Sequence, residues 1–453
     1  MSNEKALDQR MEKIVSLCKR RGFIFQASEI YGGLNGFWDY GPLGVELKRN
    51  LKDFWWRRIV RERGDVVGMD GSIIMNRAVW KASGHEETFS DPMVDCKGCN
   101  ARHRADQLPE KDGAKYCPNC GSRDLTEPQP FNLMLSTHTG PIKSEENLAY
   151  LRPETAQSIF VQFKNVLETT RQKLPFGIAQ IGKAFRNEIN PRNYIFRSRE
   201  FEQMEVEYFC RAEDGLRFLD EWLEARLKFY EDIGIPRSKI HVVNIPDGER
   251  AFYSLKTYDL EYEFPFGVQE LEGIAYRTDY DLNQHTKGSG KSLDYFDEER
   301  KERFVPHVVE PSAGVDRTTL ALLCEAFEEE TITDEAGKSE VRTVLRFHPR
   351  MAPIKCGIFP LLKNKPELVA KAQEIAALLR PHMNVFYDET GAIGRRYRRQ
   401  DEVGTPFCVT IDFDTLGEKP ELLNTVTLRH RDSMKQERVA IDTLKQLLQE
   451  AIL

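Results

Sequence analysis

The chain has 453 residues, a formal net charge of −7, 40% hydrophobic residues and 30% charged residues. This composition is typical of a globular protein with two or three domains, and it excludes an intrinsically disordered chain. No apolar run approaches the roughly 18–20 residues that a membrane helix needs, and the charged N-terminus lacks the apolar centre of a signal peptide. We therefore expect no membrane partner and a cytoplasmic location.

The first two thirds of the chain predict an α+β domain. A helix is expected over residues 43–62, where Leu47, Leu51, Phe54, Trp55 and Ile59 recur on one side. Strands are expected over residues 176–188 and 201–209, where alternate residues share a face. Consecutive strands with helices grouped elsewhere indicate an antiparallel sheet.

The last third of the chain has a different pattern of predicted elements. Residues 328–343 are polar and acidic and contain a glycine, which predicts a domain junction or an exposed loop. Beyond it, strands and helices alternate and predict a compact α/β domain. The strands are expected at 354–359, 384–387 and 407–413, and the helices around 369–379 and 441–448. The predicted domains are therefore residues 1–343 and 344–453.

Four of the nine cysteines form two close pairs, Cys96/Cys99 and Cys117/Cys120. Each CxxC pair followed by a turn can aim two thiolates at one point, and two such pairs supply the four soft ligands of a tetrahedral Zn²⁺. Such a site has no open position, so it is expected to be structural and to fold an insertion over residues 92–125. Redox pairs or spare thiols are the alternatives, and His103 between the pairs is expected to be an ordinary polar residue.

Side chains that could bind a ligand share one face of the two predicted strands. On the first strand, small residues end in Arg186 and Glu188, which leaves space for a ligand beside a positive charge. The matching face of the second strand carries Phe201, Gln203, Glu205 and Glu207. From the pattern alone, a charge-laddered surface of cross-strand ion pairs is an equal alternative.

A third segment runs from a predicted apolar strand, beginning near Val308, into a helix. Asp316 and Arg317 lie at the junction, close to Gly314, and this arrangement suits a phosphate group. When the segment is taken alone, a capped helix start with a surface arginine is the better explanation.

Together these segments resemble the three signature motifs of class II aminoacyl-tRNA synthetases. Residues 185–188 with Phe201 resemble motif 2, residues 314–317 resemble motif 3, and the Trp55 helix with residues 70–74 takes the place of motif 1. The resemblance is closest to the homodimeric glycyl-tRNA synthetases and covers nearly the whole chain. It includes the segments FWDYGP at 37–42, ASGH at 82–85, LRPET at 151–155, RTDYDL at 277–282 and EPS at 310–312.

The resemblance implies a fold and an activity. The implied fold is a class II antiparallel-sheet catalytic domain with a zinc-knuckle insertion, followed by a C-terminal α/β anticodon-binding domain. The implied activity joins glycine to ATP as an adenylate and then transfers it to the 3′ end of tRNA(Gly). Both steps depend on positioning and charge neutralisation, so no covalent nucleophile is needed. Homodimerisation through motif 1 is also implied.

The resemblance assigns catalytic roles to Arg186, Arg317 and Glu188. Arg186 is expected to neutralise the α-phosphate of ATP, Arg317 to hold the γ-phosphate, and Phe201 to stack on adenine under the Arg317 guanidinium. Mg²⁺ is expected on the phosphates, with Glu270 or Glu310 as its ligand. The full expected ATP set is Arg186, Asn187, Glu188, Phe196, Arg197, Ser198, Arg199, Glu200, Phe201, Glu270, Leu271, Gly314, Val315, Asp316 and Arg317.

For the amino acid, the resemblance implies a pocket of Glu154, Glu205, Glu310 and Ser312, in which carboxylates surround the ammonium group. A pocket too small for a methyl group needs no second editing site. The full expected set is Arg104, Glu154, Phe201, Glu202, Gln203, Met204, Glu205, Glu310, Pro311, Ser312, Ala313 and Gly314. Glu310 and Ser312 stand where motif 3 usually has glycines, which favours the glycine-specific branch.

The basic segment near residue 395 is expected to contact tRNA through its phosphates and through one aromatic side chain. The expected contacts are Arg395, Arg396, Tyr397, Arg398 and Arg399. A solvated basic helix is the alternative by pattern alone. For the whole chain, the alternatives are a non-catalytic paralogue and a synthetase for another small amino acid.

Overall fold

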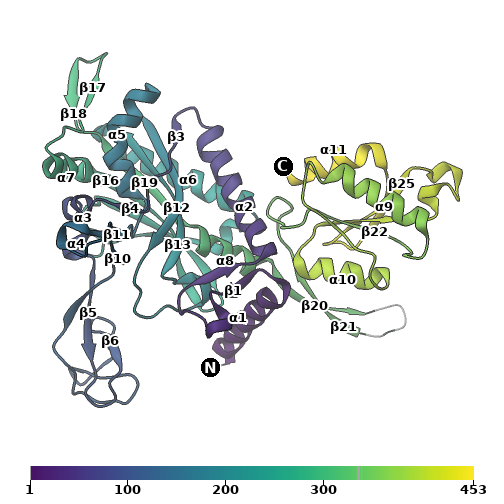
Figure 1. Ribbon diagram of the computed structural model, residues 1–453, viewed down its shortest axis with the longest axis horizontal. Helices are drawn as coiled ribbons and strands as arrows, with labels where there is room; N and C mark the ends of the chain where they lie inside the picture. The colour runs from purple at the N-terminus through teal and green to yellow at the C-terminus, as the bar shows by residue number, and fades with distance from the viewer. Residues whose placement is uncertain (1, 334–336, 338) are drawn as a thin grey trace.

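The structure is a computed structural model that describes residues 2–333, 337 and 339–453. Figure 1 shows a larger N-terminal body around one broad sheet and a smaller C-terminal body with its own sheet. Within the described ranges, every helix falls short of the length and apolar character that a membrane crossing requires.

The N-terminal body is organised by a seven-stranded sheet in the order β14-β15-β16-β19-β13-β12-β3. Its strands are β14 (Ile240–Asn244), β15 (Lys256–Phe264), β16 (Gly267–Thr278), β19 (His307–Gly314), β13 (Glu200–Cys210), β12 (Phe176–Phe185) and β3 (Val66–Gly68). All neighbours are antiparallel except β12 and β3. The predicted α+β class and the antiparallel pairing of the two predicted strands are confirmed. Because β13 pairs with both β12 and β19, it brings the motif 2 and motif 3 segments side by side.

Helices cover both faces of this sheet. The predicted helix at 43–62 is confirmed as α2 (Pro42–Trp56), continued by one π-helical turn (Arg57–Arg61). It packs with α1 (Ser2–Arg21), α6 (Gly215–Asp232) and α8 (Val315–Ala326) in the main core, which also takes Met204 and Val206 from β13. On the opposite face, α5 (Ala156–Thr170) and α7 (Tyr280–Ser289) pack over Phe176 and Phe209. Alternation along β13 therefore directs its odd-numbered residues towards α5 and α7.

The cysteine-bearing insertion projects from this body in Figure 1. Its three-stranded sheet has the order β6-β5-β9, with β5 at Ser90–Asp95, β6 at Arg102–Arg104 and β9 at Gln129–Asn132. A small hairpin of β7 (Glu110–Lys111) and β8 (Ala114–Lys115) lies between β6 and β9 in the chain. The predicted range 92–125 lies inside this module.

The segment at 328–343, predicted to be a domain junction or an exposed loop, contains two strands in its described residues. It forms most of a hairpin of β20 (Phe327–Thr333) and β21 (Ser339–Leu345), although residues 334–336 and 338 lie outside the described ranges. β-branched residues and the cross-strand pair Glu330/Arg342 favour strands despite the acidic composition. The hairpin is tied to the C-terminal body because Arg342 is fully buried against Asp401, at 2.9 Å. The predicted boundary after residue 343 falls within β21 and stays a prediction.

The C-terminal body has a five-stranded mixed sheet in the order β23-β22-β24-β25-β26. The three predicted strands are found as β22 (Cys356–Pro360), β23 (Val385–Tyr387) and β24 (Phe407–Ile411), and the predicted helices as α9 (Pro366–Leu379) and α11 (Ile441–Ile452). The pattern did not single out the antiparallel strands β25 (Thr425–His430) and β26 (Gln436–Ala440), and the basic segment near residue 395 is the helix α10 (Ile393–Val403). A core between this sheet, α9 and α11 includes Leu379, Leu444 and Leu448.

Candidate active site

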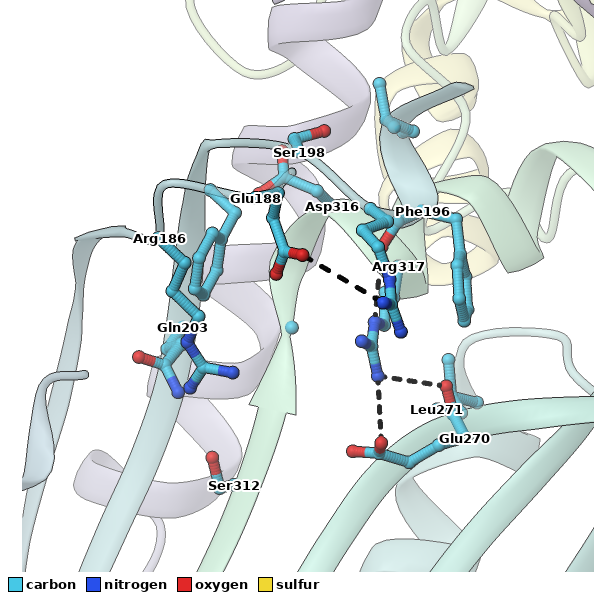
Figure 2. A pocket seen from close by; sticks show the side chains of 14 residues that line it. Arg186, Glu188, Phe196, Ser198, Gln203, Glu270, Leu271, Ser312, Asp316 and Arg317 are labelled. Atoms are coloured by element: carbon cyan, nitrogen blue, oxygen red, sulfur yellow. Dashed lines mark hydrogen bonds and ion pairs between the residues drawn. The ribbon is translucent and has the colours of Figure 1, made fainter. Parts of the chain in front are cut away.

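A pocket opens on the sheet where the ends of β12, β13 and β19 meet the start of α8 (Figure 2). Its wall consists of Arg186, Glu188, Ile195, Phe196, Arg197, Ser198, Phe201, Gln203, Glu270, Leu271, Ser312, Gly314, Asp316 and Arg317. The structure thus brings together most of the residues expected to hold ATP, from three separate stretches of the chain. We call this cavity the arginine-lined pocket.

Four of the expected nucleotide contacts lie beside this pocket rather than on its wall. Val315 is fully buried in the core, because it begins α8 on the inner side. Arg199 holds the loop by donating to the carbonyl oxygens of Glu188 and Asn35, at 2.9 and 2.8 Å. The remaining two are Asn187, whose backbone N–H donates to Leu133, and Glu200, which pairs with Lys183.

Arg186 projects into the pocket just beyond the end of β12, which is shorter than the strand predicted to include it. Its Nε donates to the carbonyl oxygen of Pro153 at 3.0 Å. Its guanidinium lies over two rings, 5.5 Å from the Phe89 centroid and 5.3 Å from the Phe201 centroid. No carboxylate of the described ranges forms an ion pair with it, so its charge is available to an anion.

The strand face below Arg186 does not leave the open space that the sequence suggested at Gly182. A Cβ atom at this glycine would lie 2.1 Å from Nη2 of Arg152. Arg152 is buried and donates from Nε to the carbonyl oxygen of Lys183 at 2.7 Å and from Nη1 to that of Gly71 at 2.8 Å. The glycine therefore makes room for a structural arginine, and the ligand space lies further along the sheet.

Arg317 lies across the arginine-lined pocket from Arg186 in Figure 2. Its guanidinium is 4.5 Å from the Phe196 ring centroid, and Nη1 lies 3.2 Å from Oε2 of Glu270. Nη1 also donates to the carbonyl oxygen of Glu270 at 3.3 Å. Arg317 is therefore stacked on Phe196 and held by Glu270, while Phe201 faces Arg186.

Asp316, next to Arg317, fixes the start of α8. Its carboxylate accepts from Lys48 Nζ at 2.9 Å, from the backbone N–H of Glu202 at 2.7 Å and from the hydroxyl of Tyr40. Glu202 pairs in turn with the same lysine at 2.8 Å. Motif 1, motif 2 and motif 3 are thus joined around one buried ammonium group.

A second, acidic cavity adjoins the first and shares Arg186, Gln203, Glu270 and Ser312 with it. Glu205 lies in its floor, with 2% of its surface exposed. It accepts hydrogen bonds from Ser312 Oγ at 2.6 Å, from Gln203 Nε2 at 2.7 Å and from the hydroxyl of Thr155. Burial and the charge of Glu154 nevertheless raise the pKa of the Glu205 carboxyl. We call this cavity the acidic pocket.

The other two predicted carboxylates of the acidic pocket are held differently. Both oxygens of Glu310 accept from Nη1 of Arg277 at 2.9 Å. Burial and the nearby Glu205 raise the pKa of Glu310 to about 7 despite this arginine. Burial also disfavours the charged form of Glu154, but His85 and a hydrogen bond from Gln157 hold its pKa below the ordinary value. Three carboxyl groups thus meet with different affinities for a proton.

The sequence left four residues around the acidic pocket without a role. Arg277 and Asp281 form a buried pair, with Nε to Oδ2 at 2.8 Å, and His85 Nε2 lies 3.4 Å from Glu154. Glu207 is fully buried, and neither of its carboxyl oxygens has a hydrogen-bond partner in the described ranges. Burial and the charge of Glu310 raise its pKa well above the ordinary value. A buried acidic cluster needs a counter-cation. The spacing of Arg277 and Asp281, four residues apart in RTDYDL, was the sequence signal that could have identified this cation.

Five residues of the predicted substrate set do not line either pocket. Met204, Pro311 and Ala313 point to the opposite face of the sheet, because side chains alternate along β13 and β19. Glu202 faces α2, where Lys48 and Lys52 hold it. Arg104 belongs to the insertion and pairs with Asp91 and Asp106. The substrate roles of these five residues stay predictions.

The four cysteines of the insertion converge as the spacing predicted. Their Sγ atoms all lie within 4.8 Å of one another, with Cys96 to Cys120 at 3.5 Å and Cys99 to Cys117 at 3.6 Å. A tetrahedral Zn²⁺ with bonds of about 2.3 Å places its sulfur ligands about 3.8 Å apart. The group therefore fits a metal of this size and geometry. His103 lies beside the four-cysteine group, with its Nε2 3.4 Å from Cys117 Sγ.

The basic segment predicted to contact tRNA is the helix α10, and its side chains are not equally available. Arg396 is buried and donates to the carbonyl oxygens of Gly391 and Pro360, so its assignment as a phosphate contact is wrong. The others form contacts within the chain: Arg398 with Glu340, Arg399 with Asp388, and Tyr397 with Thr410 at 2.6 Å. Arg395 is exposed on this helix.

Comparison with known proteins identifies the family. Residues 141–327 match the model for the class II core domain of tRNA synthetases (G, H, P, S and T), and residues 355–451 match an anticodon-binding domain. The chain is 51% identical to a glycine–tRNA ligase of Thermobifida fusca and 50% identical to one of Clostridium perfringens, over 99% of each chain. It is 51% identical to that of Treponema denticola over 95% of this chain and 94% of the relative. With its two adjoining pockets and these relatives, the chain belongs to the glycine–tRNA ligases of the class II aminoacyl-tRNA synthetases.

Proposed function

We propose that the protein charges tRNA with glycine in two steps on these adjoining pockets. In the first, a carboxylate oxygen of glycine attacks the α-phosphorus of ATP, and pyrophosphate leaves. In the second, a hydroxyl group of the 3′-terminal ribose of tRNA attacks the acyl carbon, and AMP leaves. The observation that carries the proposal is that Arg186 lines both the arginine-lined and the acidic pocket.

In the arginine-lined pocket, Arg186 and Arg317 have different roles. Arg186 stands where the pockets meet, so it neutralises charge that develops on the α-phosphate. Arg317 must exchange its contact with Glu270 for the terminal phosphate, which also releases the carboxylate. Phe201 lines the same wall and provides a ring on which adenine stacks.

Mg²⁺ would be held through Glu270 rather than Glu310. Glu270 lines both pockets, and burial and the charge of Glu270 raise the pKa of the neighbouring Asp259 to about 6, so two carboxyl groups lie close together there. Glu310 does not fit, because Arg277 occupies both of its oxygens. When bound, the ion would neutralise the phosphate oxygens.

The acidic pocket recognises glycine through its ammonium group. Glu154, Glu205 and Glu310 surround the cavity, and Ser312 fixes Glu205 in place. A bulkier amino acid would press an apolar side chain against desolvated carboxylates, which is costly. Selection therefore works by charge attraction and by lack of space, without an editing site.

The metal, the cellular location, the dimer and tRNA recognition are proposed from the chemistry of the residues and from the family of the chain. We propose that the four cysteines bind a structural Zn²⁺, and four free thiols of this kind favour the reducing conditions of the cytoplasm. Assembly as a homodimer through the motif 1 helix, and recognition of tRNA(Gly) by the C-terminal domain, are proposed for the same enzyme.

Glycine-dependent exchange of labelled pyrophosphate into ATP tests the proposal. We expect exchange with glycine and at least about 100-fold less with alanine or serine, since these carry a side chain into the pocket. Absence of glycine-dependent exchange would contradict the proposed function. Exchange with alanine or serine in place of glycine would support a synthetase for another small amino acid.

A further inference from the structure

Gln157 lies in the first turn of α5, behind the acidic pocket, and it is fully buried. Its Nε2 lies 2.9 Å from Oε1 of Glu154 and 3.1 Å from Oδ1 of Asp281. Its Oε1 lies 2.7 Å from Nε2 of His285. Both donors and the amide oxygen are therefore engaged at once.

The chemistry of the partners allows one orientation of this amide. Ionised carboxylates only accept hydrogen bonds, so the two contacts with Glu154 and Asp281 require the NH₂ group. The amide oxygen must then face His285, whose Nε2 carries the hydrogen. Asp281 and His285 are one turn apart on α7, so α7 fixes the amide that reaches the pocket.

Gln157 connects two of the three pocket carboxylates. Asp281, its second acceptor, is held by Arg277 through two hydrogen bonds of 2.8 and 2.9 Å. The same guanidinium holds both oxygens of Glu310. The chain of contacts therefore runs from Glu154 through Gln157, Asp281 and Arg277 to Glu310.

We infer that Gln157 is a positioning residue for the amino-acid pocket, which fixes Glu154 relative to Glu310 so that both face one small ammonium group. The inference rests on the proposed function. Without the amide, one oxygen of Glu154 loses its donor and the carboxylate can turn towards His85, away from the shared cavity. Because no part of Gln157 lines the arginine-lined pocket, nucleotide binding is unaffected.

The test compares Gln157→Met with Gln162→Met, a change of the same residue type on the same helix, outside both pockets. Methionine keeps the volume and flexibility of glutamine and removes its donors and acceptor. In pyrophosphate exchange, we expect Gln157→Met to raise the KM for glycine about 10- to 100-fold and to change the KM for ATP by less than about twofold. Gln162→Met should leave both constants unchanged.

If Gln157→Met does not fold, His285→Leu removes only the anchor of the amide oxygen and should raise the KM for glycine about three- to tenfold. An unchanged KM for glycine in a folded Gln157→Met, or an equal rise in both constants, would overturn the inference. Loss of glycine dependence in the unmodified protein would instead remove the proposed function, and the inference with it.

Discussion

The arginine-lined and acidic pockets share part of their wall, yet they are organised in opposite ways. In the arginine-lined pocket, Arg186 has no carboxylate partner among the described residues, and Arg317 has a single partly exposed one. In the acidic pocket, the carboxyl groups of Glu205 and Glu310 are buried and already hydrogen-bonded. In the function that we propose, the first pocket therefore binds a large anion through unpaired charges, and the second is assembled before its small cation binds.

The difference follows from the size of the ligands. A triphosphate brings several charges and displaces weak contacts such as the one between Arg317 and Glu270. A glycine ammonium group brings one charge and little surface, so the site must be fixed in advance to bind it well. We therefore expect changes in the arginine-lined pocket to act mainly on the rate, and changes in the acidic pocket to act mainly on the KM for glycine.

The largest effect is expected from Arg186→Ala, which removes the cation at the junction. Because the charge on the α-phosphate develops in the transition state, kcat for pyrophosphate exchange should fall by about 1000-fold. The exposed Arg192→Ala, in the same loop, is the control and should leave the rate within about twofold of the unmodified protein. A change in the KM for ATP alone would place Arg186 outside the reaction centre.

Glu205→Gln should have the next largest effect, on the KM for glycine and not on the KM for ATP. The substitution keeps the shape and removes one charge that faces the ammonium group, so the KM for glycine should rise about 10- to 100-fold. Glu168→Gln, at an exposed position of α5 outside both pockets, is the control. Steady-state exchange kinetics measure both variants; equal rises in the KM values for glycine and ATP would contradict the separation of the pockets.

A change in pH is expected to have a smaller effect on the KM for glycine. With its pKa raised to about 7, Glu310 is neutral below that pH and ionised above it. Since only the ionised form attracts the ammonium group, the KM for glycine should rise about tenfold as the pH falls from 8 to 6. Glu310→Gln should remove this component of the pH profile, and an unchanged profile in that variant would assign the titration to another group.

The smallest effect on exchange is expected in the C-terminal body. Arg395→Ala should raise the KM for tRNA about two- to fivefold through the loss of one phosphate contact, without changing pyrophosphate exchange. Arg396→Ala should lower Tm instead, because its guanidinium satisfies buried carbonyl groups. Thermal unfolding and aminoacylation assays separate the two; a larger tRNA effect from Arg396 would contradict its assignment as structural.

Much of the site could be predicted because its residues lie in contiguous motifs. Arg186 follows a strand, Arg317 lies in the first turn of a helix, and the spacing of the cysteines brings four thiols together locally. What could not be predicted depends on contacts between distant segments. Gly182 is small because Arg152 lies against it, and Arg277 is needed because Glu310 is buried beside it. A sequence shows neither of these neighbours.

The same limit explains the errors outside the pockets. The run of basic residues in α10 suggested a surface for phosphates, but the helix turns Arg396 inwards against carbonyl groups. Composition likewise suggested a domain junction or an exposed loop at 328–343, whereas cross-strand pairing and the buried Arg342 stabilise two strands there. In both places tertiary contacts outweigh the local pattern.

The most direct test of the two-pocket account is a crystal structure with a non-hydrolysable analogue of glycyl-adenylate. The account predicts the amino group within hydrogen-bond distance of Glu154, Glu205 or Glu310, the phosphate beside Arg186, and the adenine against Phe201. An amino group directed away from these carboxylates, or a phosphate out of reach of Arg186, would contradict it.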